Sequence, residues 1–323
     1  MTQTAGPYEG LTGFDPVFIY GAMRSGTTVF RLMLEAHGQI SNPGEVDYLF
    51  EFLHRDAGHA SGWRYDLPRL RLDRIFQSYD LTIPEGMEGL DLLADFLRQL
   101  QARAPDTVMT LNVHHKIDKI LQIFPQAKII HVLRDPRDVA RSSVPMGWAA
   151  RPYGGVDHWV TTERAWDRGI GAADPSQILD LYYEALFAGI ETELTKVCGF
   201  LGLPYNDNML RYHENTTYAA PDPKLVEQWR HKCSPDDIAL VEGKAGDLMR
   251  ARGYEPTGQG RVPNGFEAFK LKLETKIYRY RFNMRRFGPV LFFGAKLTRR
   301  LGLRALHEPM RRRMNEIHQA QLK

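Results

Sequence analysis

Side chains that can bind phosphate gather in one short stretch near the N-terminal end of the chain. The stretch reads Gly21-Ala22-Met23-Arg24-Ser25-Gly26-Thr27-Thr28. Its arginine and hydroxyl groups, with the free N–H groups of a helix that starts beyond the second glycine, would surround an oxyanion. The spacing is close to that of the nucleotide-binding loop Gly-x-x-x-x-Gly-Lys-Ser/Thr, but Thr27 replaces the lysine. The pattern predicts a phosphate cradle without ATP or GTP hydrolysis; the alternative is a tight turn that binds nothing.

A second set of anion-binding residues lies further along the chain. Arg134 follows an apolar run, and Ser142 lies eight residues later, about two turns into the helix that this turn opens. One bulky anion would bridge these two side chains. The alternative is that Arg134 forms an ion pair with Asp135 or Asp138 of its own turn.

Strands and helices must place both sets of residues at one edge of a sheet. Short apolar runs typical of buried strands are followed by helical patterns, at residues 17–20, 128–133 and 177–183. Strands that alternate with helices predict an α/β fold with a doubly wound parallel sheet, whose ligands lie at the carboxyl ends of the strands. Arg24 and Arg134 follow two of these strands, so we expect them to share one anionic ligand.

The remaining segments are expected to cover or connect this sheet. We expect a helix over 46–54, a mostly helical insertion over 55–105 and a surface loop over 144–157. The predicted fold class is therefore α/β, with a doubly wound parallel sheet, a P-loop-like phosphate cradle, a helical insertion and basic amphipathic C-terminal helices.

Composition indicates an ordinary globular protein of 323 residues, 43% hydrophobic and 25% charged. The two cysteines, Cys198 and Cys233, read as reduced thiols, and Met1 to Gly13 lacks the pattern of a secretory signal. We therefore expect a cytoplasmic protein. No His, Cys and Asp cluster has the spacing of metal ligands, so no metal is expected.

The C-terminal end of the chain differs sharply from the rest in charge. Residues 266–323 hold fifteen Lys/Arg and four Asp/Glu, a net charge of +11, which leaves −8 for the remainder of a chain whose total is +3. Apolar residues recur there at helical spacing, at Phe266, Phe269, Leu273, Ile277, Tyr280, Met284 and Phe287. We therefore divide the chain into a body, residues 1–258, and a basic amphipathic extension, residues 259–323.

Two interpretations of this apolar stripe stay open. It packs on the body or on a second subunit, which would make a homodimer. Alternatively it lies on an anionic membrane surface, which would make the protein peripheral at the inner face of the membrane. Nucleic acid is not an expected partner, because the body is acidic and has no groove-reading motif.

The two anion motifs resemble those of sulfotransferases that use 3′-phosphoadenosine 5′-phosphosulfate. The first motif is Tyr20 to Thr28, and the second runs from Phe124-Pro125-Gln126-Ala127-Lys128 to Val139-Ala140-Arg141-Ser142. A later segment, Leu181-Tyr182-Tyr183-Glu184-Ala185-Leu186, is also similar to the family. The resemblance covers residues 15–256, and the most similar branch is that of bacterial proteins resembling tyrosylprotein sulfotransferases.

The resemblance implies a role for each matching residue. Those that would hold the 5′-phosphosulfate are Arg24, Ser25, Gly26, Thr27 and Thr28. Arg134 and Ser142 would hold the 3′-phosphate, and Tyr182 would line the cofactor site. Glu45 occupies the place of the branch's catalytic base, and Arg24 would stabilise the charge that develops during transfer. The donor would be 3′-phosphoadenosine 5′-phosphosulfate, the product adenosine 3′,5′-bisphosphate, and no metal would be needed.

The chain departs from the family pattern at two places. The region from Val108 to Lys116 has no lysine at the place of the family's strand lysine. We expect Asn112, His114 or Lys116 to substitute for it, or the charge to come from elsewhere in the chain. The late loop around Thr216 to Pro221 also lacks a lysine, which disfavours a tyrosyl acceptor against a lipid-linked, glycan or small-molecule hydroxyl. Two other functions stay open: a kinase-like P-loop enzyme, and a non-catalytic, membrane-associated binding module with the same fold.

Overall fold

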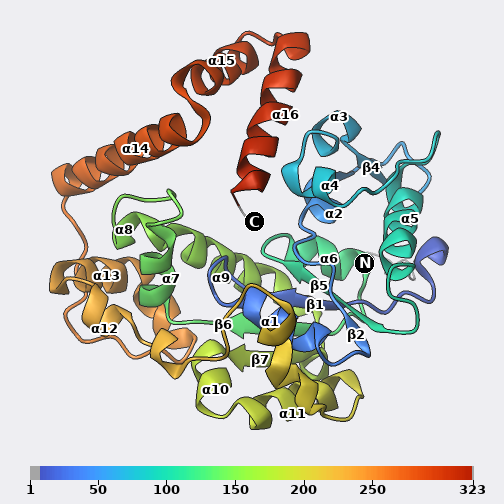
Figure 1. Ribbon diagram of the computed structural model, residues 1–323, viewed down its shortest axis with the longest axis horizontal. Coiled ribbons are helices and arrows are strands. Elements are labelled where there is room, and N and C mark those ends of the chain that lie inside the picture. The colour runs from blue at the N-terminus through green and yellow to red at the C-terminus, as the bar shows by residue number, and fades with distance from the viewer. Residues whose placement is uncertain (1–7, 322–323) are drawn as a thin grey trace.

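The computed structural model of the chain describes residues 8–321 and has a central parallel sheet (Figure 1). Five strands are ordered β2-β5-β1-β6-β7 and every neighbouring pair is parallel. The strands of this sheet are β1 (Val17–Tyr20), β2 (Ile40–Ser41), β5 (Val108–Val113), β6 (Ile129–Leu133) and β7 (Ile178–Tyr182). The predicted doubly wound α/β class is confirmed, and the carboxyl ends of the strands point to one edge.

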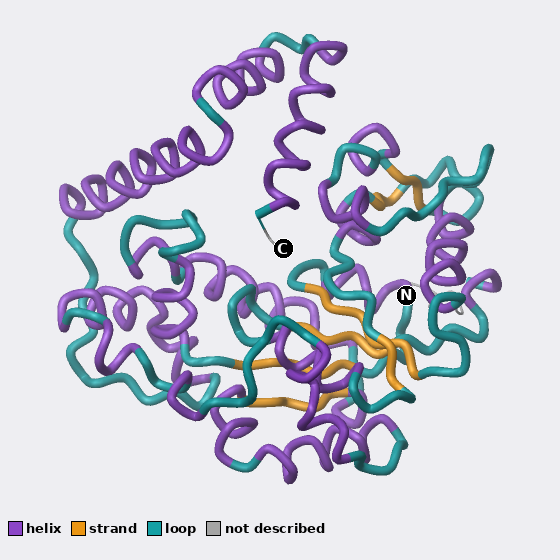
Figure 2. The backbone as a smooth tube through the Cα atoms, in the orientation of Figure 1, coloured by secondary structure: helices purple, strands orange, loops and turns teal. Residues whose placement is uncertain are grey.

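Helices cover both faces of this sheet (Figure 2). Phe18 and Tyr20 of β1 pack into one core beneath α5 and α6, whereas Val17 and Ile19 pack into the other beneath α1, α10 and α11. The helices are α1 (Thr27–Glu35), α2 (Tyr48–Glu51), α3 (Leu67–Leu70), α4 (Arg74–Ser78), α5 (Gly89–Gln101), α6 (Ile117–Ile123), α7 (Pro136–Ser143), α8 (Pro152–Gly155), α9 (Asp157–Gly169), α10 (Tyr183–Ala188), α11 (Ile190–Leu201), α12 (Trp229–Lys232), α13 (Pro235–Ala251), α14 (Gly265–Phe287), α15 (Pro289–Arg300) and α16 (Arg304–Ala320).

The insertion beside the sheet is less helical than the sequence indicated. The helix expected over 46–54 is wrong beyond Glu51, because β3 (Leu53–Arg55) pairs antiparallel with β4 (Trp63–Tyr65). A short apolar run fits a strand or a helix equally well, and here a distant partner strand decides the matter. The segment 144–157 is also more ordered than a surface loop, since it contains α8 packed closely on α7.

Three helices, α14, α15 and α16, form the tail and arch over the body before the chain returns to it (Figure 1). The predicted helix over the apolar stripe is confirmed as α14. Residues of α14 outside the stripe contact the body: Leu271 is buried, and Tyr278 Oη donates to Val144 O at 3.1 Å. The stripe itself is exposed at its N-terminal half, where Phe266 is 79% and Phe269 is 63% accessible.

Candidate active site

The loop between β1 and α1 has the conformation of an anion cradle. Arg24 and Gly26 both have positive φ angles, 73° and 91°, which fold the chain tightly before the helix begins. A Cβ at Gly26 would lie 2.3 Å from the Tyr183 ring, so only glycine fits there. Within the described residues, no side chain caps the start of α1, and the buried Ser25 Oγ has no hydrogen-bond partner. These donors remain available to a ligand.

The two anion motifs meet in space. Arg24 Nε donates to Ser142 Oγ at 3.0 Å, and Arg134 Nη1 donates to the Arg24 carbonyl at 3.2 Å. β1 and β6 are adjacent strands, so their carboxyl ends bring the loops together. Burial, together with the nearby charge of Arg134, lowers the pKa of the Arg24 guanidinium. The predicted convergence of Arg24, Arg134 and Ser142 at one strand edge is thus a feature of the structure.

Arg134 is held mainly by groups outside its own turn. Its guanidinium stacks 4.0 Å from the centroid of the Tyr183 ring, and Nη2 donates to the Leu225 carbonyl at 3.1 Å. Asp138 lies 3.8 Å away, whereas Asp135 is paired with Arg137. The buried Arg134 Nε has no hydrogen-bond partner among residues 8–321. The guanidinium is therefore held in place, and its Nε–H remains available to a ligand.

Adjacent tyrosines at the end of β7 lie in different places. Tyr182 ends the strand, and its ring lies 6.1 Å from the ring of Tyr254. Tyr183 begins α10 and packs between Gly26 and the Arg134 guanidinium. Sequence reasoning missed Tyr183. The available signal was the position of Tyr183 at the end of a predicted strand. Successive residues there point in opposite directions, so Tyr182 and Tyr183 should not share one environment.

Glu45 lies at the same sheet edge, opposite the phosphate loop. The residue forms a parallel bridge with Asn112 of β5, and its Oε1 lies 3.7 Å from His114 Nε2, an ion-pair distance. Asn42 fixes the intervening turn, because its amide donates to Asn112 Oδ1 at 2.9 Å and its own oxygen accepts from Gly44 N at 2.8 Å. The turn is thereby attached to β5, and the Glu45 side chain remains 43% accessible.

His114 connects Glu45 to the phosphate loop. Its Nδ1 lies 2.6 Å from the Gly21 carbonyl, and its backbone N–H donates to Asp47 Oδ1 at 2.8 Å. Burial alone would lower the pKa of the imidazole, but the Glu45 and Asp47 carboxylates outweigh it and raise the pKa to about 9. His114 lowers the pKa of Glu45 in return. At neutral pH the pair is a carboxylate facing an imidazolium.

The structure distinguishes the three candidates for replacing the missing strand lysine. Asn112 is buried, bonds to Asn42 and reaches the Thr27 carbonyl at 3.4 Å. Lys116 Nζ lies 3.4 Å from Glu51, so it is directed to a different carboxylate. His114 alone of the three places a cationic side chain between Glu45 and the loop. The sequence signal for His114 was its position directly after the strand β5, whose carboxyl end lies at the same sheet edge as the phosphate loop.

A parallel, doubly wound sheet with an uncapped glycine turn after its first strand defines the class of α/β proteins that bind ligands at a strand edge. Within that class the chain belongs to the sulfotransferase family, whose model matches residues 16–207.

Known relatives and structures agree with this assignment. The omega-hydroxy-beta-dihydromenaquinone-9 sulfotransferase Stf3 of Mycobacterium bovis is 32% identical over 307 residues, covering 76% of this chain and 77% of the relative. A putative protein-tyrosine sulfotransferase of Caenorhabditis briggsae is 28% identical over 211 residues, covering 63% and 71%. The sulfotransferase domain of the Synechococcus PCC 7002 olefin synthase has the same fold, with a TM-score of 0.52 and 24% identity over 72% of this chain and 95% of that domain.

Proposed function

We propose that this sulfotransferase moves a sulfuryl group from 3′-phosphoadenosine 5′-phosphosulfate to an acceptor hydroxyl, with Glu45 as the base. The observation that carries the proposal is the joining of both anion motifs at one sheet edge, with a Glu45–His114 ion pair beside them. A relative named as acting on an omega-hydroxy compound supports a hydroxyl acceptor.

The residues present fit a donor with two separate anionic groups. Ser25 Oγ and Arg134 Nε are buried donors with no protein partner in the described range, so each is available to an oxyanion of the donor. The 5′-phosphosulfate would be held by Arg24, Ser25, Gly26, Thr27 and Thr28. Arg134 and Ser142 would hold the 3′-phosphate, with Tyr183 fixing the arginine and Tyr182 lining the site beside Tyr254.

The donor supplies an activated sulfuryl group, and the protein supplies position and charge. As the acceptor oxygen bonds to sulfur, the bond from sulfur to the bridging oxygen of the phosphate breaks. Glu45 accepts the proton that the acceptor hydroxyl loses. Arg24 and protonated His114 stabilise the negative charge that develops beside the loop, the role for which the family uses a strand lysine.

The proposal predicts how transfer depends on pH. With sulfur-35-labelled donor, a chelator and a mixture of hydroxyl acceptors, label should enter an acceptor. The rate should persist below the ordinary pKa of glutamate, about 4.3, because the pKa of Glu45 is lowered. It should fall as the pH rises through about 9, where His114 loses its proton. The same proton loss removes the stabilising ion pair, so resistance to urea should decline over the same range.

Two results of this assay would contradict the proposal. Transfer of γ-phosphate from magnesium-ATP, with no sulfur transfer, would favour the kinase-like alternative. An alkaline decline that persists unchanged in His114→Asn would remove His114 from the charge balance of the site.

We further propose that the tail, residues 259–323, binds an anionic membrane surface and holds the body of residues 1–258 against it. Within residues 8–321, eleven of the thirteen exposed large apolar side chains lie between Val262 and Leu306. They share the tail with an excess of twelve positive charges. A basic helix with an unburied apolar side is typical of binding at a membrane interface. No helix in the described part of the chain is long and apolar enough to span a bilayer.

Liposome flotation tests this second proposal. Wild-type protein should float with anionic liposomes, less with neutral ones, and should be released by high salt. Phe266→Ser/Phe269→Ser should reduce partitioning by at least about tenfold, since burying one large apolar side chain contributes roughly 1.5–3 kcal/mol. Both rings are exposed, so the variant should fold normally. Truncation at Gly265 should abolish flotation and leave donor binding intact.

The opposite outcome would assign the stripe to protein packing. If the double variant floats as wild type does, or if truncation unfolds the body or splits a homodimer, the exposed stripe of α14 does not bind membrane.

A further inference from the structure

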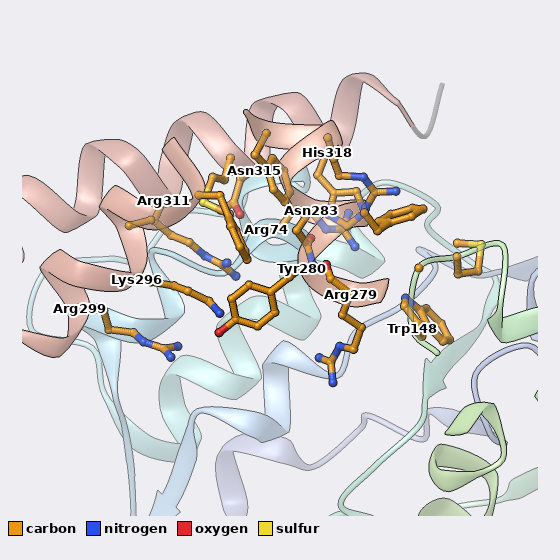
Figure 3. A pocket seen from close by; sticks show the side chains of 18 of the residues that line it. Arg74, Trp148, Arg279, Tyr280, Asn283, Lys296, Arg299, Arg311, Asn315 and His318 are labelled. Atoms are coloured by element: carbon orange, nitrogen blue, oxygen red, sulfur yellow. Dashed lines mark hydrogen bonds between the residues drawn. The ribbon is translucent and has the colours of Figure 1, made fainter. Parts of the chain in front are cut away.

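A cavity of about 750 Å³ lies between the tail helices and the body, with α4 and the segment after α7 on its inner side (Figure 3). The helix α16 is fixed there by Asn315, whose Nδ2 donates to the Leu72 carbonyl at 3.1 Å and to Gln77 Oε1 at 3.0 Å. On the other side, Phe282 of α14 packs against Gly147, where a Cβ would lie 2.3 Å from the ring. The volume is in the range of pockets that bind small ligands.

The wall of this cavity is strongly cationic. Its one carboxylate is Asp73, whose Oδ1 already caps α4 by accepting from Ile75 N and Phe76 N at 2.9 and 3.0 Å. The eight basic residues are Arg74, Lys272, Lys276, Arg279, Arg286, Lys296, Arg299 and Arg311. Among residues 8–321, none of these eight forms an ion pair. By contrast, Arg137 and Arg252 of the body contact carboxylates at 2.7 and 2.6 Å. The wall of the cavity therefore carries a large excess of positive charge.

Neutral groups hold the innermost cations in place. Arg74 Nη1 donates to Gln319 Oε1 at 3.1 Å, and Arg286 Nη1 lies 3.2 Å from His318 Nε2. Burial, with the charges of Arg74, Arg286 and Arg311, lowers the pKa of His318 to about 4, so the ring is neutral at pH 7 and accepts from Arg286. These guanidinium groups are positioned without being neutralised, which is the arrangement that an oxyanion requires.

Aromatic side chains line the same cavity beside the cations. Trp148, Phe282, Phe287 and Phe292 contribute to the wall, and Lys296 Nζ lies 3.8 Å from the centroid of the Tyr280 ring. A wall of this kind suits a ligand with an anionic group next to apolar surface, whereas a bare inorganic ion would leave the aromatic part uncovered.

The cavity is connected to the candidate reaction centre through intervening residues on two sides. Arg74 contributes to lowering the pKa of Glu45, and the Tyr79 hydroxyl, just after α4, donates to the Pro43 carbonyl on the turn that holds Glu45. On the other side, the ring of Trp148 lies 5.4 Å from that of His158, whose Nε2 is 3.0 Å from the Met23 carbonyl of the phosphate loop. These side chains therefore lie between the cavity and both Glu45 and the phosphate loop, which do not line the cavity themselves.

We propose that this cavity binds the phosphate head of an anionic amphiphile that also carries the acceptor hydroxyl. As an account of the acceptor, this inference rests on the proposed function. Arg74, Arg286 and Arg311 bind the phosphate, the aromatic wall contacts the adjoining apolar chain, and the hydroxyl lies toward Glu45. The sulfuryl group passes to that hydroxyl oxygen, and Glu45 takes its proton, as described above.

Calorimetry on the full-length protein tests the site with a monomeric probe, dihexanoylphosphatidylglycerol. Arg286→Gln/Arg311→Gln should weaken its binding by about tenfold or more, the effect of losing charge-assisted hydrogen bonds. The control is Arg285→Gln/Arg312→Gln, which removes the same charge from neighbouring positions that do not line the cavity. This control should bind the probe within about twofold of wild type, since exposed charges that do not line the cavity contribute little to binding inside it.

Three results would overturn the inference. Equal weakening in both double variants would show general attraction to a basic surface. Equal binding of dihexanoylphosphatidylcholine would show that the site does not select for a net negative charge on the lipid head group. Inorganic phosphate that binds as tightly as the lipid would make this a site for free phosphate. Adenosine 3′,5′-bisphosphate is the second titrant. If it does not bind the wild type, the proposed donor is wrong, but the evidence for lipid binding in the cavity is unaffected.

Discussion

Replacing Glu45 by glutamine is expected to lower turnover by about a hundredfold or more, as loss of a general base does. Glutamine keeps the shape of the side chain but cannot take the acceptor proton. The turn that holds residue 45 is bonded to β5 through Asn42 and Asn112, so the backbone should not move. Affinity for adenosine 3′,5′-bisphosphate should be unchanged, because Glu45 is not among the residues proposed to hold the donor.

Glu51→Gln is the matched control for this variant. The side chain of Glu51 has the same 43% accessibility as that of Glu45 and also faces one cation, Lys116, but it lies outside the proposed site. Steady-state and single-turnover rates should fall for Glu45→Gln only. Normal turnover in Glu45→Gln would remove this residue from the mechanism, and His37 and His115 would be the next bases to test.

Replacing Arg134 by alanine is expected to weaken adenosine 3′,5′-bisphosphate binding by about 1.5–3 kcal/mol, the range for a hydrogen bond to a charged group. The guanidinium is stacked on Tyr183 and bonded to the Arg24 and Leu225 carbonyls, so little freedom is lost when it binds a phosphate.

The ligand itself provides the control for Arg134→Ala. Adenosine 5′-phosphate lacks the 3′-phosphate, so its affinity should differ little between the variant and the wild type. An equal loss for both nucleotides would mean that Arg134 supports the loop through the Arg24 carbonyl and does not contact the 3′-phosphate.

The parts of this molecule that the sequence predicts well are those encoded by neighbouring residues. A strand, a glycine turn and a helix start fall within 17–35, and the structure has β1, the positive φ of Gly26 and α1 in that order. The stripe from Phe266 to Phe287 predicts α14 for the same reason. Local chemistry is sufficient here, because turn, cap and periodicity act over a few residues.

The parts that escaped prediction depend on contacts between distant segments. The Glu45–His114 pair forms because residue 45 bridges to Asn112 of β5. Neither the sequence around Glu45 nor that of β5 indicates the register of this bridge. Tyr183 reaches Gly26 only because β7 ends at Tyr182. The cationic cavity needs α16 to return to α4, a contact between Asn315 and Gln77 that no local pattern indicates.

The most direct test of the central claim is a calorimetric titration of the wild-type protein in the presence of a chelator. The account predicts that adenosine 3′,5′-bisphosphate binds without divalent metal and more tightly than adenosine 5′-phosphate, because the loop after β1 and Arg134 hold one phosphate each. Binding of ATP with magnesium, with no binding of the bisphosphate, would contradict it.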